Sequence, residues 1–332
     1  MKKKPGLNWL LMSIIFYILF FLTLDSLPKA QTIKPKFQHP QGDFVQINGV
    51  KLWYESEGVG EPLLLIAGGP GFAHNYFHPF FSALSNKFRV IYFDAFGCGK
   101  SDRAKSAKEY SLARDVENIE GLRKALNLEK INVLGHSYGG SVAQAYALKY
   151  PNSVKRLILA NTIPSGKDLQ TMVDGVNRQV QAQLPEVWDK IQQLRARGFR
   201  SSSKEHQEIY SVPPVLYDFY NPENFLKLPR FAAPEPNLLN PELWYAIAGE
   251  DADFQIGGEL GRWDVRAQLN QLKMPILVFA GRFDRGLSPR LTLQYKTLIP
   301  HAQFVMFEKS GHLPFVEETE ETMSVLRKFL DQ

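Results

Sequence analysis

INVLGHSYGGSVAQAYALKYP, residues 131–151, contains a short aliphatic run that leads directly into a helical pattern ending at a proline. At the junction the residues read Gly135-His136-Ser137-Tyr138-Gly139, which matches G-x-S-x-G. This motif places a serine in a sharp strand-to-helix turn, where side chains at the flanking glycine positions would collide with neighbouring backbone. Because the expected strand precedes the motif and the expected helix follows it, Ser137 is predicted to be a nucleophile at the edge of a sheet.

Two further side chains follow apolar runs near the C-terminus, where a serine nucleophile would need its partners. A serine hydroxyl requires a base that takes its proton, and the base requires a carboxylate that holds its tautomer. The run AQFVMFEKSGH ends in His312, and PILVFAGRFD ends in Asp284. The order Ser137, Asp284, His312 is the Ser…Asp…His order of the hydrolases that carry this motif. The sequence therefore predicts a catalytic triad.

An oxyanion site is predicted from the glycine-rich loop Ala67-Gly68-Gly69-Pro70-Gly71, which follows the apolar run PLLLI. Such a site needs one backbone N–H from this loop and one from the residue after the nucleophile. The expected donors are Gly69 and Tyr138. A tight turn without a catalytic part would have the same sequence, so both interpretations remain open here.

The rest of the chain predicts an α/β fold, with a mostly parallel sheet and helices on both faces. Near-continuous aliphatic runs indicate strands that are covered on both sides, and Asn48-Gly49 indicates an antiparallel hairpin at the start. Between about 163 and 262 the aliphatic runs are replaced by a polar helical pattern and a proline-rich stretch, which indicates an inserted helical cap. The expected divisions are a core from 31 to 162, the cap from 163 to 262, and the rest of the core from 263 to 332.

The first 30 residues predict a membrane-targeting segment that is separate from the fold. Three lysines precede an apolar run over residues 9–24, so the protein is expected to be exported, with the segment either cleaved as a signal peptide or kept as an anchor. If the segment is not cleaved, membrane contact is expected only through residues 9–24. Residues 1–30 carry four lysines and one aspartate, so without them the net charge falls from +5 to +2. This small charge gives no reason to expect nucleic acid as a partner.

Neither a cofactor nor a metal is predicted. Cys98 is the single cysteine, so an internal disulfide is excluded. His74 and His78 lack the glutamate of an H-E-x-x-H zinc motif. The stretch GCGKS, residues 97–101, is similar to the end of a phosphate-binding loop, but Asp94 stands where the first glycine of that motif is required. A nucleotide site is therefore disfavoured.

With these motifs in place, the chain resembles the proline iminopeptidases of the α/β-hydrolase superfamily. The resemblance rests on four stretches: GGPGFAHNY (68–76), DAFGCGKS (94–101), GHSYGG (135–140) and the pair GRFD and SGH. It departs from the family at Ala67, where histidine is usual, and at Ala95, where glutamine is usual. It implies a serine hydrolase, without a cofactor, that releases the N-terminal residue of a small peptide.

The resemblance also implies an acidic group in the cap that holds the substrate's ammonium. In the stretch GEDADFQIGGELGRWD the candidates are Asp253 and Glu250, and the alternative is an ordinary solvated acidic loop. Two other functions remain open. One is a carboxylesterase or lactonase that acts on a small acyl substrate, and the other is a binding protein of the same fold without turnover.

Overall fold

Asn48 and Gly49 form the turn of the predicted hairpin, with φ angles of 49° and 82°. Positive φ at both central residues matches the right-handed twist of the two strands it joins, β1 (Gly42–Ile47) and β2 (Val50–Glu57). In the computed structural model, residues 39–210, 218–228 and 239–332 are described. The predicted targeting segment lies outside the described residues.

The hairpin opens an eight-stranded sheet in the order β1-β2-β4-β3-β5-β6-β7-β8. The pairs β1–β2 and β2–β4 are antiparallel, and all the other neighbouring pairs are parallel. The remaining strands are β3 (Glu61–Ile66), β4 (Phe88–Phe93), β5 (Ile131–His136), β6 (Val154–Ala160), β7 (Ile276–Gly281) and β8 (Gln303–Phe307). The aliphatic runs that were expected to be strands are therefore strands, and the predicted α/β-hydrolase fold is confirmed.

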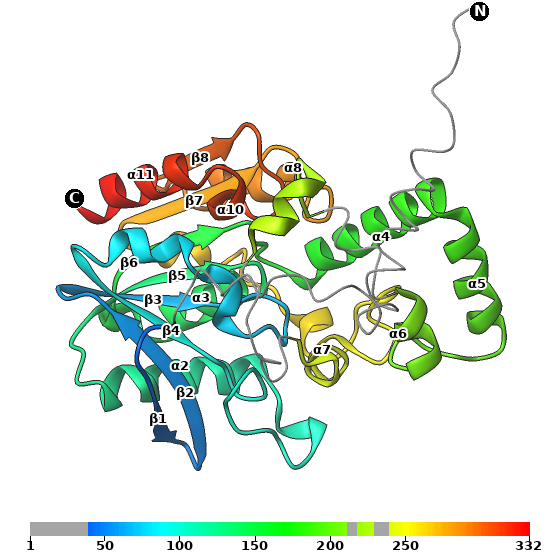
Figure 1. Cartoon of the computed structure of the whole chain (residues 1–332), viewed down its shortest axis with the longest axis horizontal. Helices are drawn as coiled ribbons and strands as arrows, with labels where there is room; N and C mark the ends of the chain where they lie inside the picture. Colours follow the sequence, from blue (N-terminus) through cyan, green and yellow to red (C-terminus); the bar gives the residue numbers. More distant parts are fainter. Residues whose placement is uncertain (1–38, 211–217, 229–238) are drawn as a thin grey trace, which may run out of the picture. The chain divides into compact units, whose positions relative to one another are not determined.

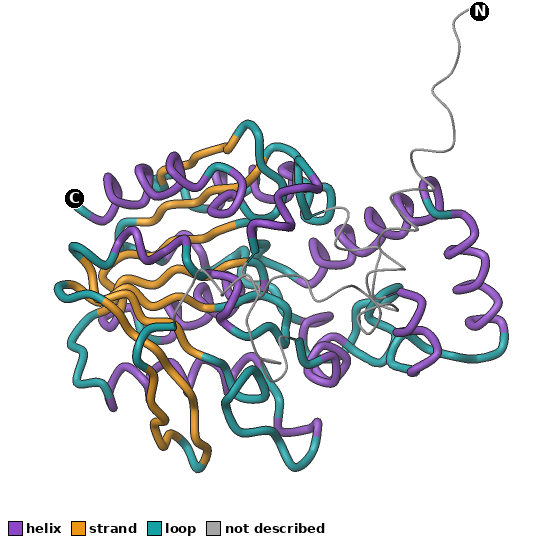
Figure 2. Tube along the Cα trace, viewed as in Figure 1, coloured by secondary structure: helices purple, strands orange, loops and turns teal. Residues whose placement is uncertain are grey.

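Helices cover both faces of this sheet (Figure 1). The core against one face includes side chains from α2 (Leu112–Ala125) and α3 (Tyr138–Lys149), and the core against the other includes side chains from α10 (Pro314–Glu317) and α11 (Thr319–Leu330). Two further short helices, α8 (Pro289–Leu293) and α9 (Tyr295–Leu298), lie between β7 and β8 in the chain. The strands form a continuous layer between these helices (Figure 2).

The strand β3 shows why its sequence is apolar without alternation. Leu63 and Leu65 belong to the core under α11, whereas Leu64 and Ile66 belong to the core under α2 and α3. Successive side chains of a strand point to opposite faces, so a strand covered on both sides buries consecutive residues, as β3 does from Leu63 to Ile66.

A helical segment joins β6 to β7 and has a small core of its own. Its described helices are α4 (Gly166–Gln183), α5 (Pro185–Ala196), α6 (Lys204–Tyr210) and α7 (Pro241–Ala248). Val180, Ile191 and Tyr210 form a buried cluster that is separate from the two cores under the sheet. Within the described ranges, no helix combines the length and apolarity that crossing a membrane requires.

Candidate active site

Ser137 occupies the turn between β5 and α3, in a backbone conformation that few residues with side chains adopt. Its φ is 55° and its ψ is −123°. Positive φ in a residue other than glycine costs free energy and persists only where the surrounding structure imposes it. Here the main chain of Ser137 is held from both sides, because its N–H donates to Ala160 O and its carbonyl accepts from Thr162 Oγ1.

The two glycines of the motif leave room for this turn. A Cβ on Gly139 would lie 2.2 Å from the carbonyl oxygen of Ile66 on β3. A Cβ on Gly135 would lie 2.2 Å from the carbonyl oxygen of Gly139. Neither contact is sterically possible, so the close approach of α3 to the sheet requires glycine at both positions.

Asp284 and His312 follow β7 and β8 and form a hydrogen bond at the same edge of the sheet. The distance from His312 Nδ1 to Asp284 Oδ2 is 2.6 Å, and the carboxylate is buried. Asp284 Oδ1 also accepts from the backbone N–H of Leu287 at 2.7 Å. A charged carboxylate on Nδ1 keeps the proton there and leaves Nε2 as the basic nitrogen of His312.

Two residues that the sequence analysis did not single out, Asn161 and Asp218, form hydrogen bonds with Asp284 and His312. Asn161, directly after β6, donates from Nδ2 to Asp284 Oδ2 at 2.9 Å and to Gly311 O at 3.2 Å. The backbone carbonyl of Asp218 accepts the backbone N–H of His312 at 2.6 Å. Asn161 follows a strand directly and could have been found by the pattern that revealed Asp284, whereas Asp218 has no such signal.

The charges around His312 favour its protonated form. Burial acts to lower the pKa of His312, but the carboxylates of Asp284 and Asp218 outweigh burial and raise it to about 9. Burial raises the pKa of Asp218 to about 6, with the charge of His312 acting in the opposite direction. A neutral His312 therefore becomes abundant only at alkaline pH.

His136, inside the G-x-S-x-G motif, precedes Ser137 in the chain and contacts His312. Its ring centroid is 4.7 Å from that of His312, and its Nε2 donates to His312 O at 2.9 Å. In the described part of the chain, Ser137 Oγ and His312 do not form a hydrogen bond. The structure thus joins the predicted acid to the predicted base and places the nucleophile next in sequence to a residue that contacts the base.

The same His136 connects the base to the glycine-rich loop. Its Nε2 carries the proton because the carbonyl of His312 can only accept, so its Nδ1 accepts from the hydroxyl of Tyr76 at 2.9 Å. That hydroxyl accepts the N–H of Gly68 at 2.8 Å. A continuous hydrogen-bond chain therefore runs from Gly68 through Tyr76 and His136 to His312, which the sequence did not indicate.

The glycine-rich loop lies against the nucleophile, since a Cβ on Gly68 would approach Ser137 Cβ to 3.0 Å. A small cavity of about 20 Å³ opens beside it, lined chiefly by apolar groups and by Asp115. Its wall includes Gly68, Gly71, Phe72, Tyr138 and Leu243. Both the loop and the residue after Ser137 thus border one space.

Asp94, in the stretch that resembled a phosphate loop, supports the segment after the glycine-rich loop. Its Oδ1 accepts the N–H of His74 at 3.1 Å, and its Oδ2 accepts the N–H of Lys100 at 2.9 Å. The ammonium of Lys100 lies 4.5 Å from the ring centre of Trp53, in a cation–π contact. These contacts indicate that the stretch GCGKS, residues 97–101, is a structural turn.

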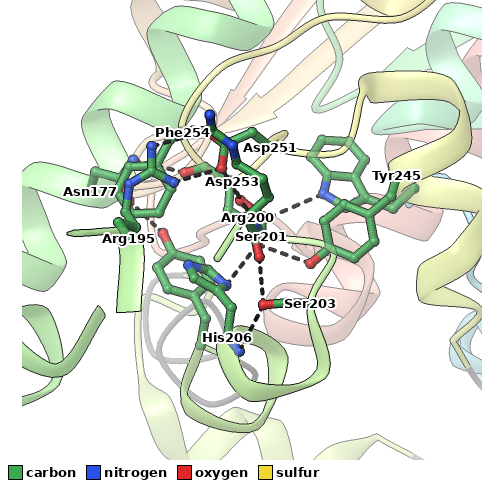
Figure 3. A network of polar contacts seen from close by, with 12 residues as sticks. Asn177, Arg195, Arg200, Ser201, Ser203, His206, Tyr245, Asp251, Asp253 and Phe254 are labelled. Atoms are coloured by element: carbon green, nitrogen blue, oxygen red, sulfur yellow. Dashed lines mark hydrogen bonds and ion pairs between the residues drawn. The ribbon is translucent and has the colours of Figure 1, made fainter. Parts of the chain in front are cut away.

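The predicted ammonium ligands follow α7 in the segment that joins β6 to β7, and Figure 3 shows Asp253 within a polar network there. Asp253 accepts from Trp244 Nε1 at 3.1 Å and from Tyr245 Oη at 3.0 Å. Burial raises its pKa to about 6, although these two hydrogen bonds act to lower it. Glu250 is exposed. Neither carboxylate lines the cavity beside the loop.

A strained serine above the edge of a doubly covered parallel sheet, with a buried Asp–His pair at the same edge, defines the class of the hydrolases with the α/β fold. A family model described as alpha/beta hydrolase fold matches residues 61–319. The chain therefore belongs to the α/β-hydrolase fold family, and it is a hydrolase of this fold.

Within the family, the chain is similar to proline iminopeptidases. It is 30% identical over 292 residues to the proline iminopeptidase of Heyndrickxia coagulans, which covers 87% of this chain and 98% of that protein. The crystal structure of the Mycobacterium smegmatis proline iminopeptidase has a TM-score of 0.67 at 23% identity, covering 88% of this chain and 98% of that one. A thermophilic esterase from Thermogutta terrifontis, with a TM-score of 0.64 at 23% identity, covers the same shares of the two chains. At this identity the two structures show the fold alone.

Proposed function

We propose that this protein is a serine hydrolase that releases the N-terminal residue from small peptides, as an aminopeptidase of the proline iminopeptidase type. The observation that supports the reaction class best is the Asp284–His312 hydrogen bond at the sheet edge beside the strained Ser137. The names of the relatives support the substrate class, because the similarity spans nearly their whole length.

In the proposed mechanism, His312 Nε2 takes the proton of Ser137 Oγ, which attacks the carbonyl carbon of the scissile amide. The backbone N–H groups of Gly69 and Tyr138 stabilise the oxyanion of the tetrahedral intermediate. His312 then gives its proton to the leaving amine, and an acyl-enzyme forms on Ser137. Water, activated by the same imidazole, hydrolyses that ester and restores the serine.

The ammonium group of the substrate is proposed to bind to Asp253. Asp253 is held by Trp244 and Tyr245, the two residues of α7 that follow Leu243. Leu243 lines the cavity beside the glycine-rich loop, so α7 connects that cavity with the carboxylate. A half-buried carboxylate attracts an ammonium more strongly than a fully solvated one.

The test compares two substrates in two cap variants, Asp253→Asn and Asp189→Asn. Asp189 is an exposed residue of α5 and serves as the matched control. For a prolyl arylamide we expect Asp253→Asn to raise KM by roughly 10- to 100-fold, because a charge-assisted hydrogen bond is lost. For a p-nitrophenyl ester both variants should behave like the wild type.

An equal rise of KM for both substrates would reject the ammonium site while leaving the hydrolase intact. Glu250→Gln is expected to have a smaller effect on KM than Asp253→Asn, because the Glu250 side chain is screened by solvent. If the prolyl arylamide is not cleaved and the ester is, the protein is a carboxylesterase or lactonase instead. If Ser137 fails to react with a fluorophosphonate, the protein is a binding protein of this fold.

We further propose that residues 163–262 act as the cap over this site and that residues 1–30 direct export. The first proposal rests on the separate small core of α4, α5 and α6. The second rests on the sequence alone, and N-terminal sequencing of the protein from its native host would test it.

A further inference from the structure

Four side chains outside the proposed active site converge on one point beneath the segment that follows the glycine-rich loop. They are His39, Glu55, His74 and His78, and one donor atom from each lies within 4.8 Å of the other three. Glu55 is on β2, while His74 begins the short helix η1 (His74–Phe77) and His78 follows it. Nothing in the proposed hydrolysis uses this cluster.

The distances from Glu55 to the three histidines are close to those between two ligands of a tetrahedral zinc ion. From Glu55 Oε2 to the nearest ring nitrogens of His39, His74 and His78 the distances are 2.9, 3.3 and 3.4 Å. Ligands bound to zinc at 2.0–2.1 Å stand about 3.3 Å apart at the corners of a tetrahedron.

The atoms around the cluster prepare its donors for a metal. Asp94 Oδ1 lies 2.8 Å from His74 Nδ1 and accepts its proton, and His74 Nε2 lies 3.3 Å from Glu55 Oε2, so in the neutral imidazole Nε2 is the nitrogen that can bind a metal. A carboxylate on the outer nitrogen of a histidine is the common arrangement around bound zinc. The second oxygen of Glu55 accepts from Trp53 Nε1 at 3.1 Å, which leaves Oε2 as the ligand atom.

The cluster is closed to solvent, which favours a structural role for the metal. The side chains of Glu55, His74 and His78 are at most 1% exposed, and that of His39 is 20% exposed. Four protein ligands leave no open position for water or substrate.

We propose that His39, Glu55, His74 and His78 form a structural zinc site that ties the start of the described fold to the segment behind the oxyanion loop. That segment carries Tyr76, whose hydroxyl holds both Gly68 and His136. A zinc ion bound by His74 and His78 holds η1 in place. Because Tyr76 is part of η1, the ion therefore also stabilises the hydrogen-bond chain that reaches His312. The proposal is independent of the substrate.

The experiment measures zinc in the full-length chain, purified without a polyhistidine tag and without chelators. We expect about one zinc per chain by mass spectrometry, as for a closed structural site. Removal of zinc by a chelator should lower the melting temperature by roughly 5 °C, and added zinc should restore it. Cobalt(II) in place of zinc should give the strong visible absorption of a four-coordinate ion.

Two variants and one control locate the metal. His39→Gln and Glu55→Gln should each weaken zinc binding by roughly 100-fold or more, since a direct ligand is lost and even outer partners contribute 10- to 100-fold. His301→Gln, at an exposed histidine outside the cluster, should keep the affinity of the wild type. Asp94→Asn, which retains all four ligands, should weaken binding less than either ligand variant.

A wild-type protein that neither contains zinc nor takes it up in titration overturns the proposal, whatever the variants do. So does zinc binding that persists at full affinity in both ligand variants. Should His39→Gln and Glu55→Gln fail to fold, the cobalt spectrum of the wild type decides, because weak six-coordinate absorption would contradict a tetrahedral site.

Discussion

At the scale of single residues, the protonation of His312 is the property that most directly limits the proposed chemistry. Two carboxylates face this imidazole, Asp284 through a hydrogen bond and Asp218 through its charge, and together they raise its pKa to about 9. Only the neutral imidazole can accept the proton of Ser137. The base is therefore strong but scarce at neutral pH.

We expect kcat/KM to rise about tenfold per pH unit below pH 9 and to level off above it, because the neutral fraction of His312 rises in that way. Asp218→Asn removes one negative charge and should therefore move this rise of kcat/KM, the acidic limb of the pH profile, to lower pH. The backbone oxygen of Asp218 still holds His312 in the variant. Steady-state rates between pH 5 and 10 measure the limb, with Asp189→Asn as the control.

A wild-type limb centred near the ordinary histidine value would show that Asp284 and Asp218 do not control the base. An unchanged limb in Asp218→Asn would restrict the effect to Asp284.

At the scale of secondary-structure elements, the contact between β5, α3 and β3 decides the position of Ser137. Gly139 allows α3 to approach the carbonyl of Ile66, and the turn between strand and helix exists only with this approach. The glycines of the G-x-S-x-G motif are thus required by packing alone.

Gly139→Ala should lower the free energy of unfolding by about 3 kcal/mol, since its Cβ would lie 2.2 Å from a backbone oxygen. Gly175→Ala on α4 is the matched control. A Cβ there meets only Arg178 Nη2 at 3.8 Å, so the variant should gain about 0.5–1 kcal/mol from helix propensity. Urea denaturation of the two variants measures both effects, and equal changes would contradict the steric account.

At the scale of the whole molecule, the helices between β6 and β7 depend on their own polar contacts as well as on a small core. Asp251 accepts from both terminal nitrogens of Arg195, at 2.6 and 2.9 Å, and from Ser201 Oγ at 3.0 Å. The guanidinium of Arg195 also lies 3.7 Å from the ring centre of Phe254 (Figure 3). One carboxylate thereby joins α5, the segment before α6 and the loop after α7.

Asp251→Asn should destabilise this segment by about 2 kcal/mol, because Arg195 loses the charge of its partner. We expect faster amide hydrogen exchange in α4, α5 and α6, and unchanged exchange in β5 and β6, which belong to separate cores. Uniformly faster exchange would mean that the segment and the sheet unfold as one unit.

The sequence determined the order of the strands and helices, and it determined which candidate catalytic residues follow the strands. Aliphatic runs covered on both faces, a positive-φ turn at Asn48-Gly49 and a proline stop after α3 are local signals, so they could be found without the fold. Ser137, Asp284 and His312 each follow a strand, and the carboxyl ends of parallel strands meet at one edge of a sheet. Their approach at one edge could therefore be predicted from the sequence, and the structure pairs two of them, Asp284 and His312.

Only the tertiary structure decided which other groups surround them. Asn161 meets Asp284 across 123 positions of sequence, His136 meets His312 across 176, and His39 meets Glu55 across 16. The order of the strands in the sheet and the path of the inserted helices decide such contacts. Neither of them produces a periodic pattern in the sequence. For the same reason the sequence around His74 and His78 shows no metal motif. Glu55 and His39 come close to these two histidines only in the folded chain, where β2 pairs with β4.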